Sequence, residues 1–171
     1  MKNLLSLELD PISRTRRNHG LEHATLHILG KKHQGVPMGG ISTPSGFMIV
    51  GNVSTEDVAE AAIEALLKLR AGETHLATHP YCGTNFAFSG LIAGMAAWVG
   101  TIGAGKAFKN KLQRLPVMIV LATLALIFTR PLGPMIQQHI TTSSDPEGLE
   151  LERVETVIRA GMRMHRVITR H

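Results

Sequence analysis

The chain has few cysteines and aromatic residues, and little excess charge outside one short block. Its 171 residues include one cysteine, Cys82, which excludes an intrachain disulfide and gives no sign of an oxidising compartment. Aromatic residues make up 4% of the chain, too few for a surface that stacks on bases. The net charge of +5 arises from the basic residues between 106 and 114 and from Arg130, while residues 1–85 are balanced. This distribution indicates that nucleic acid is not a partner.

The N-terminus also lacks the long apolar run of a secretory signal. Residues 1–10 contain only a short apolar stretch that soon turns acidic. We therefore expect no signal peptide.

The most informative segment that is present is His19-Gly20-Leu21-Glu22-His23, followed one helical turn later by His27. At about 100° per residue, a helix places these three histidines and the glutamate within an arc of roughly 140°. The order H-x-x-E-H is that of the inverzincins, in which two histidines hold zinc and the glutamate is the general base. The spacing therefore predicts a metal site on this helix.

A second group of metal-ligand residues lies in a polar loop predicted over residues 73–85. His79 and Cys82 offer an imidazole and a thiolate there. With His19 and His23 they make a set of three nitrogens and one sulfur, which favours zinc first and iron second. If all four bind, the site is closed and structural. If one position stays open, Glu22 lies beside it to accept a proton from water.

Each of these residues also has an ordinary alternative role. His19 and His23 could cover a helix surface, and His79 could form hydrogen bonds in a turn before Pro80. A single Cys82 is more often a small buried apolar residue than a ligand. The sequence leaves these alternatives open.

Periodicity and turn residues predict the other elements. We expect a helix over residues 13–30, a small hairpin from residues 39–42 and 47–53, and a second helix capped by Ser54. Apolar residues after the polar turn at residues 143–146 suggest a terminal helical segment.

Two long apolar segments lie between these parts. Residues 86–105 carry no charge, and neither do residues 115–129. After Arg130 the second apolar run continues to residue 136. A bilayer span needs about 20 apolar residues. The lengths favour a transmembrane hairpin in the cell membrane, with a pair of buried helices as the alternative. Its orientation is left open because the basic loop and the missing signal point in opposite directions.

The expected fold class is mixed α/β and mostly helical: a small soluble layer with a short β-hairpin, plus a two-helix transmembrane hairpin. Residues 1–85 would form the metal-site region and residues 86–136 the transmembrane hairpin. Residues 137–171 would form a C-terminal helical segment that packs on the N-terminal region.

Several sequence blocks resemble the YqhQ-like bacterial membrane proteins, a family described as predicted metal-dependent enzymes. Residues 18–25 resemble its H-G-x-E-H signature, and residues 53–58 are similar to its next helix-opening segment. Residues 79–86 are similar to its H-x-x-C-G-T-S-F block, and residues 134–142 to its L-Q-x-x-T-T block. The resemblance covers roughly residues 17–160. The chain lacks the family's long N-terminal part and inserts a Gly/Pro-rich hairpin.

The resemblance implies a membrane-attached metal site built from His19, Glu22, His23, His79 and Cys82. The motif itself favours a membrane-bound hydrolase that uses a metal-activated water with Glu22 as general base. Its substrate would be a peptide or a membrane-embedded molecule. The alternative is a membrane scaffold or assembly protein with a structural metal, in which homo-oligomers are possible.

A second set of residues is expected around the ligands or the substrate. They are His27, Thr84, Asn85, Gln138, His139, Thr141 and Thr142.

Overall fold

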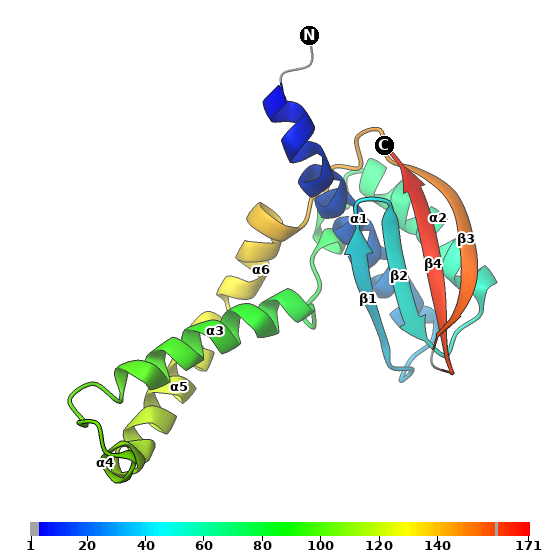
Figure 1. The fold of residues 1–171 in the computed structure, drawn as a ribbon. Coiled ribbons are helices and arrows are strands. Elements are labelled where there is room, and N and C mark those ends of the chain that lie inside the picture. Colours follow the sequence, from blue (N-terminus) through cyan, green and yellow to red (C-terminus); the bar gives the residue numbers. More distant parts are fainter. Residues whose placement is uncertain (1–3, 160) are drawn as a thin grey trace. The chain divides into compact units, whose positions relative to one another are not determined.

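The computed structural model describes residues 4–159 and 161–171, with residues 4–10 described by their backbone alone (Figure 1). The chain forms two units. Residues 1–79 and 138–171 form one, which we call the globular unit. Residues 80–137 form the other, which we call the hairpin unit. The globular unit is therefore made from two chain segments that flank the hairpin unit.

The first helix, α1 (Leu4–Lys32), contains the predicted helix over residues 13–30 and begins earlier. Gly20 allows another segment to approach this helix closely, because a Cβ there would overlap the carbonyl oxygen of Ser143. The amide of Ser143 donates to the carbonyl of Arg16 at 2.9 Å. The returning chain thus lies directly on α1.

The predicted hairpin is confirmed as β1 (Met38–Thr43) and β2 (Gly46–Gly51), which pair antiparallel around Pro44 and Ser45. The second predicted helix is confirmed as α2 (Thr55–Arg70). Ser54 caps it by accepting a hydrogen bond from the amide of Asp57 at 3.0 Å. A short 3₁₀ helix, η1 (Thr74–Ala77), follows.

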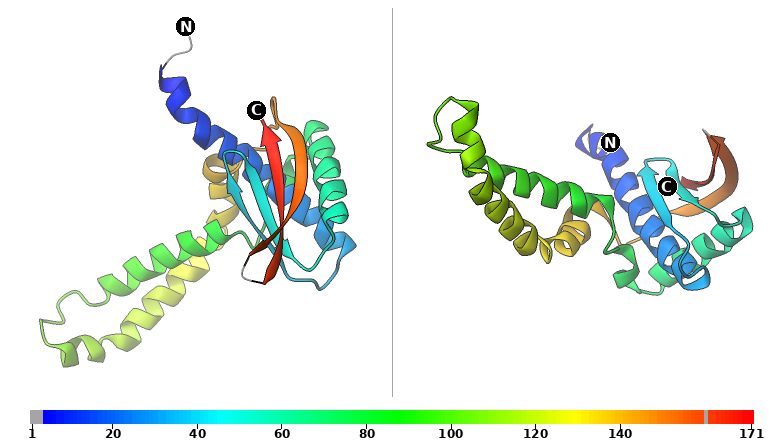
Figure 2. Two further views of the ribbon diagram at one scale, coloured as in Figure 1. Left: turned by 45° about the vertical axis from the view of Figure 1, so that its right-hand side comes forward. Right: turned by 90° about the horizontal axis from the view of Figure 1, so that it is seen from below.

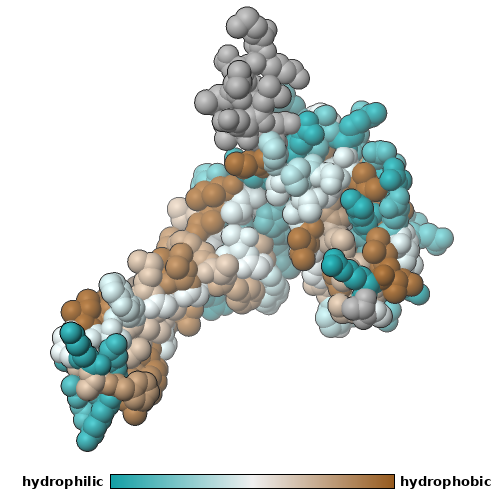
Figure 3. Space-filling view, in the orientation of Figure 1, coloured by the Kyte–Doolittle hydropathy of each residue, from teal (hydrophilic) through white to brown (hydrophobic). Residues whose placement is uncertain are grey.

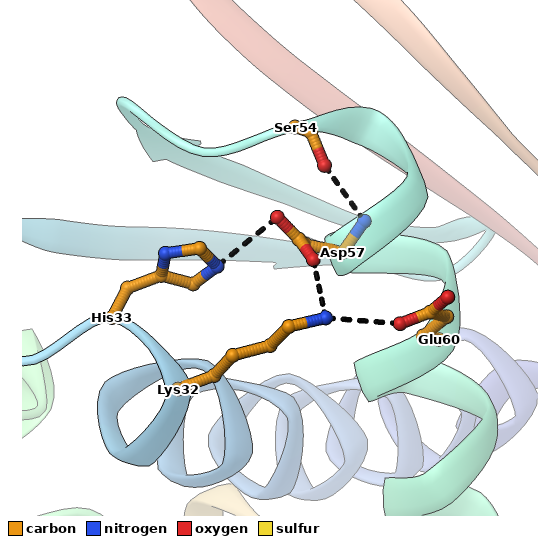
Figure 4. Close-up of polar contacts among 5 residues, drawn as sticks. All are labelled: Lys32, His33, Ser54, Asp57 and Glu60. Carbon is orange, nitrogen blue, oxygen red and sulfur yellow. Dashed lines mark hydrogen bonds and ion pairs between the residues drawn. The ribbon is translucent and has the colours of Figure 1, made fainter.

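A charged cluster joins the end of α1 to the start of α2 (Figure 4). Lys32 forms ion pairs with Asp57 and with Glu60, and His33 lies 3.1 Å from the second carboxylate oxygen of Asp57. These hydrogen bonds, with Lys32 and Ser54 the largest contributors, lower the pKa of Asp57 to about 2. The cluster holds the two helices together at this end.

The predicted C-terminal helical segment is wrong. Residues 150–170 form two strands, β3 (Glu150–Arg159) and β4 (Met162–Arg170), and extend the hairpin to a four-stranded antiparallel sheet in the order β1-β2-β4-β3. The physical reason lies in the alternation along β4, where His165, Val167 and Thr169 are buried and Arg166 between them is exposed. The spacing of the apolar residues in β3 fits both the helical period and the strand period, so the sequence did not distinguish a helix from a strand there.

Helices α1 and α2 cover one face of the sheet, and the core lies between these layers (Figures 1 and 2). Phe47, Ile49 and Val167 enter it from the sheet. The apolar stripe of α2 supplies much of the rest, because all its members are buried: Val58, Ala61, Ala62, Ala65, Leu66 and Leu69. The fold class is therefore mixed α/β, with a larger sheet than the expected short hairpin.

The hairpin unit is helical. Its main helices, α3 (Gly83–Val99) and α5 (Leu115–Thr129), pack on each other. The shorter α4 (Phe108–Gln113) and α6 (Leu132–Ile136) precede and follow α5, and a π-helical turn, η2 (Gln137–Thr141), leads back to the globular unit. Hydrophobic side chains line both long helices (Figure 3), including Trp98, which is 69% exposed.

The predicted transmembrane hairpin over residues 86–136 is wrong. Within the described residues, no single helix is long and apolar enough to cross a membrane; by length and composition alone, only a bent pair, Leu115–Thr129 with Leu132–Thr141, passes such a test. The expected segments were too long because α3 ends at Val99, before glycines with positive φ at 103 and 105. Pro131 similarly separates α5 from α6.

Candidate metal centre

Helix α1 presents a row of imidazoles to the segment that follows η1. The ring centres of His19 and His23 lie 4.3 Å apart, and their ligand nitrogens lie within 4.8 Å of each other. The i, i+4 spacing on a helix causes this proximity, since such residues are one turn apart. Two imidazoles on a rigid support are thus close enough to share one ion.

Backbone carbonyls fix the orientation of both rings. Nδ1 of His19 lies 2.9 Å from the carbonyl oxygen of Thr141, and Nδ1 of His23 lies 2.9 Å from that of Ala77. A carbonyl oxygen only accepts, so each Nδ1 carries the proton and each Nε2 carries the lone pair. Histidines that bind metals are oriented in this way by an acceptor on the second ring nitrogen. The pair therefore fits a metal.

His27 continues the row but has the opposite tautomer. Its Nε2 donates to the carbonyl oxygen of Thr78 at 2.8 Å, which leaves the lone pair on Nδ1. Its ring centre lies 4.8 Å from that of His79. The structure therefore places His27 beside a predicted ligand; its role as a supporting residue stays a prediction.

His79 lies at the end of the same row, with its ring centre 5.9 Å from that of His23. Burial, and then the neighbouring imidazoles of His27 and His23, lower the pKa of His79 to about 4. The ring is therefore neutral at pH 7, the form in which histidine binds metal ions. His79 thus lies beside His23 and His27, and its part in the predicted ligand set stays a prediction.

Cys82, the remaining predicted ligand, is buried and precedes α3 as its N-cap residue. It belongs to the hairpin unit, three residues after His79. Its place in the predicted ligand set stays a prediction.

Glu22, the predicted general base, faces β1. Ser42 on that strand donates a hydrogen bond to its Oε2 at 2.5 Å. Gly40 lies against the same carboxyl group, and a Cβ at that position would be 2.5 Å from the carboxyl carbon. With 3% of its surface exposed, Glu22 is held between α1 and β1. The imidazoles bond instead to the segments at residues 77–78 and 141.

The returning segment contributes backbone carbonyls to the contacts around α1. Arg16 donates to the carbonyl oxygens of His139 and Thr142, each at 3.1 Å, and thereby holds the segment whose carbonyl at Thr141 orients His19. The exposed side chain of His139 takes no part in these contacts. Three of the predicted supporting residues therefore lie at the site. His139 and Thr142 each contribute a carbonyl oxygen to Arg16, and Thr141 contributes one to His19.

Thr84 and Asn85 lie in the first turn of α3, in the hairpin unit. Asn85 accepts a hydrogen bond from Nε2 of Gln137 at 2.7 Å and donates to the carbonyl of Pro80 at 3.1 Å. These contacts join the start of the hairpin unit to its end. The structure thus gives Asn85 a packing role within its own unit.

A cavity of about 350 Å³ adjoins the carbonyl-bearing segments. Gln138 and Thr142, both predicted to orient a substrate, line it together with His75 and Thr78. Its volume lies at the lower end of the range for small-molecule sites.

The sequence missed Ser42, Gly40 and the carbonyls of Ala77 and Thr78. Backbone acceptors have no residue-type signature. The pair Gly39-Gly40 inside a strand was the one available signal, because glycine in a strand often marks a close approach.

Residues 14–154 match the family described as a domain of unknown function, DUF6391. The chain is 35% identical to an uncharacterized protein of Picosynechococcus sp., with the match covering 82% of this chain and 71% of that protein. No solved structure matches. The resemblance to the YqhQ-like proteins stays a prediction. By the extent of both matches, this chain belongs to the DUF6391 family.

Proposed function

We propose that this chain holds a zinc ion on His19, His23 and His79, with Cys82 as the fourth ligand. The observation that supports this most directly is the pair of imidazoles one helical turn apart, His19 and His23. Their ligand nitrogens lie within 4.8 Å of each other, and the Nδ1 atom of each is bonded to a backbone carbonyl. Three nitrogens and one thiolate suit zinc, with iron as the second choice.

The geometry favours a structural use of this ion, as in a scaffold protein. His23 is 1% exposed, and Glu22 is held against β1 by Ser42. The same helix contacts residues 77–79 and 139–143, which border the points where the chain leaves and re-enters the globular unit. Zinc would cross-link its ligands there. Both chain segments would then be fixed on α1.

Hydrolysis is the second candidate, and the cavity lined by Gln138 and Thr142 favours it. In that use those two side chains would bind a peptide or ester, and Glu22 would accept a proton from the attacking water. Glu22 would then have to turn from its contact with Ser42.

Glu22→Gln separates the two uses, since glutamine keeps the shape of the side chain and can still accept from Ser42. If the site is structural, the variant should retain zinc, and EDTA should lower its melting temperature by as much as it lowers that of the wild type. A hydrolytic site predicts turnover of a fluorogenic peptide library by the wild type and at least a hundredfold less by the variant. Cys82→Ser should lower zinc content in either case, and unchanged content would remove Cys82 from the ligand set.

A further inference from the structure

The second face of the sheet, which α1 and α2 do not cover, carries a cavity of about 340 Å³. Strand register shows which residues share this face. Met48 pairs with Arg166, and Val50 pairs with Met164, whereas their neighbours Ile49 and His165 are buried on the helix side. The apolar residue Ile41, which is 69% exposed, pairs with Met48 on the edge strand. The floor of the cavity is therefore aliphatic and open to solvent.

Two arginines line this apolar cavity, Arg159 and Arg166. Within the described part of the chain neither makes a hydrogen bond or an ion pair, unlike most arginines of the globular unit. Glu155 lies opposite Arg166 in the register, but its carboxylate accepts from Arg153 instead. Two guanidinium groups thus stand beside an aliphatic surface without an internal counter-ion.

We propose that this face binds a long-chain fatty carboxylate, with its carboxylate on Arg166 or Arg159 and its chain over Met48, Val50 and Met164. Guanidinium groups bind carboxylates through paired, charge-assisted hydrogen bonds. The backbone groups of β2 and β4 are already used in the sheet, since each strand has a partner on both sides. The floor therefore offers little to a peptide, which needs backbone hydrogen bonds, and suits an aliphatic chain with one anionic end. This site is independent of the metal centre.

The test is titration calorimetry of the full chain with dodecanoate below its critical micelle concentration. The double variant Arg159→Gln/Arg166→Gln should bind at least tenfold more weakly than the wild type, and dodecanol should bind at least tenfold more weakly than dodecanoate. Arg163→Gln is the matched control, because Arg163 also makes no hydrogen bond or ion pair with the residues that the structure describes, lies on the same strand as Arg166 and does not line the cavity. It should bind within about twofold of the wild type.

The apolar hairpin unit could also take up dodecanoate, so the bound position must be mapped. A diazirine-bearing fatty carboxylate, photo-crosslinked and located by peptide mass spectrometry, should label residues 46–51 and 162–170. Labelling confined to residues 80–137 would overturn the proposal. So would equal affinity of the double variant and the wild type, or absence of dodecanoate binding.

Discussion

The carboxyl group of Glu22 lies against Gly40, so that a Cβ on residue 40 would stand 2.5 Å from its carboxyl carbon. Ser42, two residues further along the same strand, donates to this carboxylate. The carboxylate of the H-x-x-E-H motif is thus held in position by β1, a strand that lies about twenty residues later in the chain. This close contact explains why residue 40 of β1 is a glycine.

Gly40→Ala should therefore destabilise the protein more than the substitution Gly39→Ala at the neighbouring position. The added methyl group must displace Glu22, and we expect a loss of about 1–3 kcal/mol in the free energy of unfolding, measured by urea titration. Gly39→Ala is the control, since a Cβ there meets nothing within 4 Å. Equal losses in the two variants would contradict the close packing of Glu22 on β1.

Asn18 should be a strong contributor to stability. It is fully buried, donates to the carbonyl of Thr43 at 2.8 Å and accepts from the hydroxyl of Thr169 at 2.8 Å. Asn18→Ala removes both bonds and leaves the buried hydroxyl of Thr169 without this acceptor, so we expect a loss of about 2–4 kcal/mol by urea titration. Ser45→Ala, at an exposed position in the adjacent turn, should change stability by less than about 0.5 kcal/mol. A loss of less than 1 kcal/mol for Asn18→Ala would contradict this contact set.

The cluster around Asp57 predicts a pH dependence. Lys32 and Ser54 lower the pKa of Asp57 from its ordinary 3.8 to about 2, so its contribution is fully present above pH 4 and is lost as the pH falls through 2. The free energy of unfolding should decline over this interval in the wild type. Asp57→Asn should flatten that decline, whereas Glu64→Gln, which removes an exposed i, i+4 pair with Lys68, should leave it in place. Identical pH profiles for all three proteins would contradict the assignment.

The elements that the sequence predicted correctly are those with an unambiguous period or turn. The apolar stripe of α2 matches only a helix, and Pro44-Ser45 between apolar runs matches only a hairpin turn. Residues 150–159 were misread because Leu151, Val154 and Ile158 also lie one helical turn apart. The span lengths were misread because α3 ends at Val99, before the positive-φ glycines at 103 and 105, and Pro131 separates α5 from α6.

The candidate site was predictable to the extent that it is local. The spacing of His19 and His23 predicted neighbouring rings, and these lie 4.3 Å apart. The acceptors that orient them come from Ala77 and Thr141, 54 and 122 residues away, and are backbone atoms. Any residue type supplies a carbonyl, so tertiary structure alone could identify these contacts.

The central claim is that α1 holds a metal ion, and metal content measures it most directly. Inductively coupled plasma mass spectrometry of the purified full chain should find about one zinc per chain. The variant His19→Ala/His23→Ala should lose it, and His139→Ala, which removes an exposed imidazole near the same segment, should retain it. Absence of stoichiometric metal in the wild type, both after gentle purification and after incubation with zinc, would contradict the account.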